Sequence, residues 1–123
     1  MKKPDDMTYS QYLSKLALDF RTEDIPDSAY IAASRLLIDT LGCALVGMSA
    51  PGIMTVSEKM TEWGGRPDAT VLMTGAKVPA AHAAFANSAL IHAMDYDDVY
   101  IPGSLHITSV VVPAVLAAAD ISV

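Results

Sequence analysis

Apolar side chains recur every three or four residues along most of this chain, the spacing that places them on one face of a helix. The pattern predicts a first helix from Thr8 to about Phe20, and either Thr8 or Ser10 could cap its start. A second helix is predicted from Pro26 to about Val46, since proline is well tolerated in a first turn. Apolar residues surround most of this second helix, so we expect it to be buried on most sides.

Gly42 lies inside this second helix, where a glycine costs about 1 kcal/mol relative to alanine. A close contact between helices would explain that cost. We therefore expect Gly42 to pack against another helix, and we expect Gly47 to end the helix.

Further along the chain, turn residues separate three more helical segments and one short apolar run with β-branched residues. The fifth helix should begin near Ser109, with Pro113 tolerated only in or next to its first turn. The expected fold is mainly α: a packed multi-helix domain of about five helices with at most one short strand or hairpin. The predicted ranges are 53–63 and 80–94 for the third and fourth helices, 69–73 for the strand or extended segment, and 95–105 for an acidic loop.

The composition fits a folded domain. Of the 123 residues, 52% are apolar and 18% are charged, which is too hydrophobic for a disordered chain. The net charge of −6 argues against a nucleic-acid partner, because a phosphate backbone needs a basic face. Cys43 is the sole cysteine, which excludes an internal disulfide and fits a reducing compartment.

The sequence contains no recognisable targeting segment. A polar stretch follows the first lysines, where a signal peptide would have an apolar one. The apolar run from Val110 to Ala119 is too short to span a bilayer. We therefore expect a cytoplasmic protein without a membrane partner. Because the last helix is still apolar where the sequence stops, we expect residues 1–123 to be the N-terminal fragment of a larger helical domain.

The densest polar cluster lies at the end of the predicted fourth helix and in the loop beyond it. It contains His92, Asp95, Asp97, Asp98 and His106. Three carboxylates at the negative end of a helix dipole are unfavourable, and such a cost often indicates function. The turn at residues 102–103 would bring His106 back towards Asp95, and a carboxylate beside a histidine is suited to proton transfer near neutral pH.

Three interpretations of this cluster stay open on the residues alone. It is a solvated surface loop, a site of acid–base catalysis, or a Mg²⁺ or Mn²⁺ site built on the Asp-x-Asp-Asp stretch. For catalysis we expect Asp95 and His106 to line one pocket. Successive helical residues point about 100° apart, so we expect Asp97 to face solvent and Asp98 to cap the loop or support the site.

Several stretches of the chain together resemble the MmgE/PrpD family, which includes 2-methylcitrate dehydratases, cis-aconitate decarboxylases and iminodisuccinate epimerases. The resemblance covers the chain from about Tyr9 to Asp120. The stretches that carry it are Asp39-Thr-Leu-Gly42 followed by Gly47, residues 79–98 ending in His-Ala-Met-Asp-Tyr-Asp-Asp, and His106 with the apolar segment 110–120.

The resemblance implies that residues 1–123 are the N-terminal part of a larger all-helical domain, followed by more of that domain and an α/β second domain. It implies a homodimeric lyase or epimerase, similar to 2-methylcitrate dehydratase, that removes a proton next to a carboxylate of a small di- or tricarboxylate. No metal or organic cofactor is implied. Asp95 and His106 match active-site positions of the family, and we assign His92, Asp98 and Ser104 as substrate-binding or supporting residues.

The sequence departs from the family pattern at Val99, Ser88 and Ile107, and the spacing from Asp95 to His106 is long for the decarboxylase branch. These departures argue against cis-aconitate decarboxylase activity, and they leave a non-catalytic interaction domain or degenerate family member as the alternative. The cluster contains no basic residue to hold a carboxylate substrate. We therefore expect residues 1–123 to be inactive alone.

Overall fold

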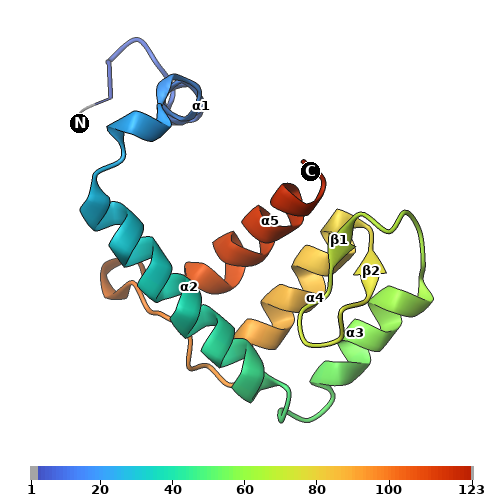
Figure 1. The fold of residues 1–123 in the computed structure, drawn as a ribbon. Coiled ribbons are helices and arrows are strands. Elements are labelled where there is room, and N and C mark those ends of the chain that lie inside the picture. Colours follow the sequence, from blue (N-terminus) through green and yellow to red (C-terminus); the bar gives the residue numbers. More distant parts are fainter. Residues whose placement is uncertain (1–2, 123) are drawn as a thin grey trace. The chain divides into compact units, whose positions relative to one another are not determined.

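The computed structural model describes residues 3–122 and is mainly helical, as predicted (Figure 1). Five α-helices, two 3₁₀ turns and one two-stranded hairpin make up the described chain. In order they are α1 (Tyr9–Asp19), η1 (Thr22–Asp24), α2 (Asp27–Gly47), α3 (Ile53–Glu62), β1 (Ala69–Thr70), β2 (Lys77–Val78), α4 (Ala80–His92), η2 (Ile101–Gly103) and α5 (Thr108–Asp120).

The chain divides into two compact units, one ending at Ala33 and one beginning at Ser34. In the first unit, Thr8 caps α1 as predicted. Its hydroxyl accepts a hydrogen bond from the Gln11 backbone N–H at 3.3 Å, and the Gln11 side chain accepts one from the Thr8 N–H at 2.9 Å. This reciprocal capping box satisfies two N–H groups at the helix start. No residue of α1 is buried in the described chain.

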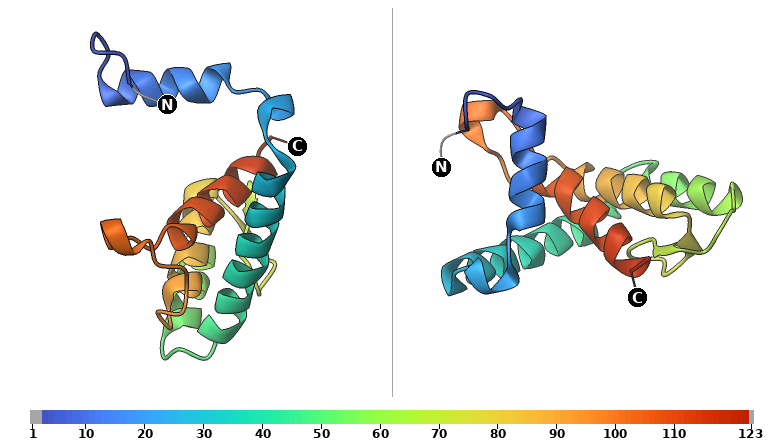
Figure 2. Two further views of the ribbon diagram at one scale, coloured as in Figure 1. Left: turned by 90° about the vertical axis from the view of Figure 1, so that its left-hand side faces the viewer. Right: turned by 90° about the horizontal axis from the view of Figure 1, so that it is seen from above.

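The second unit contains α3, α4, α5 and the hairpin. Helix α4 lies beside α5 and also contacts α3 (Figure 2). Small side chains allow this close packing, since Ala83, Ala86 and Ala117 are buried together with Met60 and Val71 in one apolar core. This packing fixes the C-terminal end of α4, from which the acidic loop departs.

The predicted strand is shorter than the apolar run that suggested it. Only Ala69 and Thr70 pair in the antiparallel hairpin, where Ala69 is opposite Val78. The chain then leaves the ladder because the buried Asn87 side chain of α4 takes over the hydrogen bonding. Its Oδ1 accepts from the Leu72 N–H at 2.7 Å, and its Nδ2 donates to the Thr70 carbonyl at 2.9 Å.

Helix α2 has the predicted length, but the expectation that it is buried on most sides is wrong. Its buried residues are Thr40, Cys43, Ala44 and Gly47, all in its C-terminal half. By length and apolar composition alone, α2 is long and apolar enough to cross a membrane, although no membrane-spanning segment was expected from the sequence. A single helix of this kind is weak evidence for a membrane segment, because core helices of soluble proteins meet the same criterion.

The predicted helix contact at Gly42 is also wrong, and Gly47 provides it instead. A Cβ atom added to Gly42 would meet nothing within 4 Å. At Gly47 the same atom would lie 2.0 Å from the Leu90 carbonyl oxygen of α4. The last turn of α2 therefore lies directly against the α4 backbone, and Cys43, Ala44, Leu90 and Ile91 form a second apolar core there.

Pro113 was expected in or next to the first turn of the fifth helix, and it lies inside α5, beyond the first turn that starts at Thr108. The proline ring removes the backbone N–H that would bond to the Ser109 carbonyl. Pro113 is fully buried, and α5 packs along α4, so tertiary packing keeps the helix intact beyond it.

Candidate active site

The acidic loop starts with a sharp turn at the end of α4. Asp95 adopts a left-handed backbone with φ of 56°, and its N–H donates to the His92 carbonyl at 3.0 Å. Aspartate is among the few residue types other than glycine that enter this conformation readily. The turn ends the helical path, so the residues after Asp95 no longer follow the rotation of α4.

The loop then closes on itself and returns to α4. The Tyr100 N–H donates to the Leu105 carbonyl at 2.8 Å, and the two residues form an isolated antiparallel bridge. The 3₁₀ turn η2 lies between them. This closure brings His106 back towards the start of the loop, where its Nε2 lies 3.5 Å from Asp95 Oδ1. The predicted proximity of Asp95 and His106 is confirmed.

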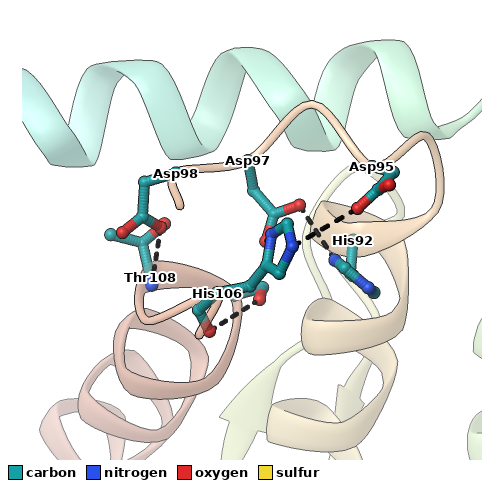
Figure 3. Close-up of polar contacts among 7 residues, drawn as sticks. His92, Asp95, Asp97, Asp98, His106 and Thr108 are labelled. Atoms are coloured by element: carbon teal, nitrogen blue, oxygen red, sulfur yellow. Dashed lines mark hydrogen bonds and ion pairs between the residues drawn. The ribbon is translucent and has the colours of Figure 1, made fainter. Parts of the chain in front are cut away.

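Asp97 lies at the centre of the site (Figure 3). Its side chain is completely buried, with Oδ1 2.9 Å from His92 Nδ1 and Oδ2 3.3 Å from His106 Nδ1. The first contact is a hydrogen bond, and the second is an ion-pair distance without hydrogen-bond alignment. The expectation that Asp97 faces solvent is therefore wrong, because it assumed helical rotation beyond Asp95, where the left-handed turn redirects the chain.

The Asp97 carboxylate is stabilised by its surroundings. Burial raises the pKa of this carboxyl, but interactions with the Ser109 hydroxyl and the His92 imidazole outweigh burial and hold the pKa below its ordinary value. Asp97 is consequently an anion at neutral pH, placed between two imidazoles.

The two imidazoles approach each other edge to face, with ring centroids 4.7 Å apart. The His106 side chain is 28% exposed, whereas that of Asp95 is 76% exposed. Asp95 and Asp97 thus face different nitrogens of the same His106 ring: the solvent-exposed carboxylate is near Nε2 and the buried one is near Nδ1. The accessible side of the cluster is the Nε2 side.

Asp98 points away from this cluster and stabilises α5. Its Oδ1 accepts a hydrogen bond from the Thr108 N–H at 2.8 Å and another from the Thr108 hydroxyl (Figure 3). These bonds satisfy a free N–H at the helix start. Asp98 therefore caps the start of α5 rather than the loop, and its assignment as a substrate-binding or supporting residue stays a prediction.

Ser104 lies outside the cluster. It ends η2 in a left-handed conformation with φ of 49°, and its side chain is exposed. Its backbone N–H donates to the Ile101 carbonyl, so the observed role of Ser104 is in the turn that returns the chain to His106. Its assignment as a substrate-binding or supporting residue stays a prediction.

His92, Asp95, Asp97 and His106 can each offer one atom to a metal ion, and these atoms lie within 4.8 Å of one another. Two imidazoles and two carboxylates are suitable ligands for Zn²⁺. Asp98, which belonged to the Asp-x-Asp-Asp stretch considered as a Mg²⁺ or Mn²⁺ site, is not part of this group of four and binds Thr108 instead. Asp97 is hydrogen-bonded to His92 and lies 3.3 Å from His106 Nδ1, so one buried carboxylate faces both histidines.

Sequence reasoning missed the central position of Asp97 and the proximity of Cys43. Cys43 is buried in α2, as expected for a core thiol. Burial raises its pKa, and the negative charges of Asp39, Asp97 and Asp98 raise it further. A residue two positions after Asp95 points away from it in a helix but to the same side in an extended chain, and the sequence alone did not show that the helical path ends at Asp95.

Comparison with known proteins identifies the family. Residues 11–122 match the MmgE/PrpD N-terminal domain. The chain belongs to the MmgE/PrpD family. A cis-aconitate decarboxylase of Aspergillus terreus is 32% identical over 105 residues, covering 85% of this chain and 21% of the relative. The cis-aconitate decarboxylase of Homo sapiens is 28% identical over 97 residues, covering 78% of this chain and 20% of the relative.

The chain thus spans about a fifth of the length of these MmgE/PrpD relatives. Their names support a lyase-type family. They give no support to our preference for a dehydratase over a cis-aconitate decarboxylase, which rested on departures at single positions.

Proposed function

We propose that this chain is the N-terminal segment of a lyase that acts on a small di- or tricarboxylate, and that His106 transfers a proton at the carbon next to a substrate carboxylate. The observation that carries this proposal is the position of His106 between the exposed Asp95 and the buried Asp97. An imidazole held by a carboxylate on one nitrogen, with its other nitrogen on the accessible side, is suited to general acid–base catalysis.

The same imidazole serves either branch of lyase chemistry. In a dehydration, His106 Nε2 takes the proton from the carbon next to the carboxylate, the C–H electrons form the double bond as the C–O bond breaks, and the leaving hydroxyl departs as water with the proton that Nε2 then gives up. In a decarboxylation, the C–C bond breaks, CO₂ leaves, and protonated Nε2 returns a proton to the carbanion. In the dehydration the C–H electron pair forms the new double bond, and in the decarboxylation the electron pair of the broken C–C bond stays on the carbon that is then protonated. The assignment of a branch therefore depends on substrate tests.

The charge of the cluster requires help from outside this segment. The carboxylates of Asp95 and Asp97 lie beside His106, and a carboxylate substrate carries further negative charge. No lysine or arginine follows Lys77 in the chain. The basic groups that hold the substrate must then come from the rest of the complete protein, so we expect no turnover from residues 1–123. The homodimer and the cytoplasmic location are likewise proposals for the complete protein.

The proposal is tested by kinetics of the complete protein with cis-aconitate, 2-methylcitrate and iminodisuccinate as separate substrates. We expect one of them to turn over, and His106→Gln to lower kcat by at least about 10²-fold, the scale of a positioned acid or base. The matched control is His82→Gln. His82 is a histidine of α4 whose ring packs against Trp63, so the kcat of this variant should stay within about threefold of wild type. A His106→Gln variant as active as this control would refute the proposal. A folded wild type without turnover would favour the non-catalytic alternative.

A further inference from the structure

We propose that Asp97 is a positioning residue that holds His106 in the tautomer with hydrogen on Nδ1, leaving Nε2 free for the proton that the substrate exchanges. The inference rests on the proposed function and adds a residue to it. It starts from the geometry of one carboxylate: Asp97 is completely buried, and each of its oxygens faces the Nδ1 atom of a different histidine, at 2.9 Å and 3.3 Å.

The tautomer follows from what each atom can donate. A neutral imidazole has one N–H, and a carboxylate can only accept. The 3.3 Å contact between His106 Nδ1 and Asp97 Oδ2 is not an aligned hydrogen bond, but hydrogen on Nδ1 makes it an attraction, whereas hydrogen on Nε2 would set the Nδ1 lone pair against a buried negative charge. With hydrogen on Nδ1, the Nε2 lone pair lies on the side of Asp95, whose carboxylate is 76% exposed and therefore screened by water. The buried carboxylate thereby decides which nitrogen is reactive.

His92 stabilises the carboxylate that does this. A buried anion is costly unless it is hydrogen-bonded, and the His92 contact at 2.9 Å is the aligned bond to Asp97. His92 is the last residue of α4, so the helix end fixes the position of the carboxylate. The end of α4 thus positions His92, His92 positions Asp97, and Asp97 in turn faces His106.

The charged and titratable groups around Asp97 come from three parts of the unit. His92 belongs to α4, His106 and Asp95 to the loop, and Cys43 of α2 is close enough for the Asp97 charge to raise its pKa. Of these, only the imidazoles offer hydrogens to the carboxylate. Replacing Asp97 by a neutral residue of equal size would remove the sole buried anion that faces His106 Nδ1 among the described residues.

The test uses the Asp97→Asn variant of the complete protein. Asparagine keeps the size but can present its oxygen to one imidazole only, so the tautomer of His106 is no longer fixed. We expect kcat to fall by on the order of 10²–10⁴-fold with KM changed by less than about threefold.

A spectroscopic measurement separates positioning from simple support of the fold. Heteronuclear NMR of the imidazole nitrogens should show hydrogen on Nδ1 of His106 in the wild type and a mixture of tautomers in Asp97→Asn. Asp98→Asn is the matched control, because it makes the same change one residue away and removes the cap of α5. It should lower the Tm and leave the His106 tautomer as in the wild type.

The outcomes are distinct from those of the proposed function. If His106→Gln abolishes turnover while Asp97→Asn keeps both kcat and the tautomer, the proposed function stands and this inference is overturned. If Asp97→Asn fails to fold, the wild-type spectrum still decides. Hydrogen on Nε2 of neutral His106 in the wild type would overturn the inference without any variant.

Discussion

The contact between α2 and α4 at Gly47 determines the position of the site, and one pair of substitutions tests it. In Gly47→Ala, the new Cβ would lie 2.0 Å from the Leu90 carbonyl oxygen, although real Cβ atoms essentially never approach closer than 3.0 Å. The two helices must therefore separate by about 1 Å there. The blocking atom belongs to the backbone, so no side-chain rotation can relieve the contact. Two residues after Leu90, His92 is hydrogen-bonded to Asp97, so a shift of the α4 end would move the site.

The magnitude follows from the two competing effects of the substitution. Overpacking a well-packed interface costs about 1–3 kcal/mol, and a fixed backbone atom places this site at the upper end. The matched substitution Gly42→Ala, in the same helix, meets nothing within 4 Å and should gain about 1 kcal/mol in helix propensity. Both glycines lie in the helix and share most of that gain, so we expect the two variants to differ by about 1–3 kcal/mol in the free energy of unfolding, the cost of overpacking at Gly47.

Urea unfolding of the complete protein, followed by far-UV circular dichroism, measures this difference. The movement of the α4 end should also lower kcat in Gly47→Ala, while Gly42→Ala keeps it. Equal stability of the two alanine variants would show that Gly47 is not the residue on which α2 and α4 meet, and the reasoning about the position of His92 would fail with it.

Two further predictions concern hydrogen bonds that keep the second unit in place. Asn87→Leu should lower the free energy of unfolding by about 2–4 kcal/mol, because it leaves the Leu72 N–H and the Thr70 carbonyl unpaired, whereas Ser88→Ala should change it by less than about 0.5 kcal/mol. The lowered pKa of Asp97 means that its stabilisation is present above the ordinary value of 3.8 and is lost as the pH falls through the lower folded value. The difference in Tm between wild type and Asp97→Asn should therefore shrink in acid below about pH 4, and a difference that grows there would contradict the assigned sign.

The helices and their starts could be predicted from the sequence because local chemistry determines them. Thr8 caps α1 through Gln11, three positions further along the chain, and Pro26 lies directly before the first turn of α2. Likewise the return of His106 to Asp95 depends on a short turn whose proline and glycine are visible in the sequence. Each of these features involves residues that are close together along the chain.

The errors arose where distant residues or one unusual backbone angle decide the structure. Gly42 and Gly47 are equally compatible with a helix contact in the sequence, and only the position of Leu90 distinguishes them. Asp97 was expected in solvent because the left-handed conformation of Asp95 could not be inferred from residue type alone. Pro113 stays within α5 because it is buried against its surroundings, a tertiary effect that outweighs its local preference.

Chemical rescue tests the central claim, that His106 transfers the proton, most directly. In the complete protein, His106→Ala should lose at least about 10²-fold in kcat, and added imidazole should restore activity in proportion to its concentration, because the free base enters the space that the side chain leaves. His82→Ala, which removes a histidine elsewhere on α4, should neither lose the activity nor respond to imidazole. A folded His106→Ala protein that retains wild-type kcat, or that has lost turnover and does not respond to imidazole at any concentration, would contradict the account.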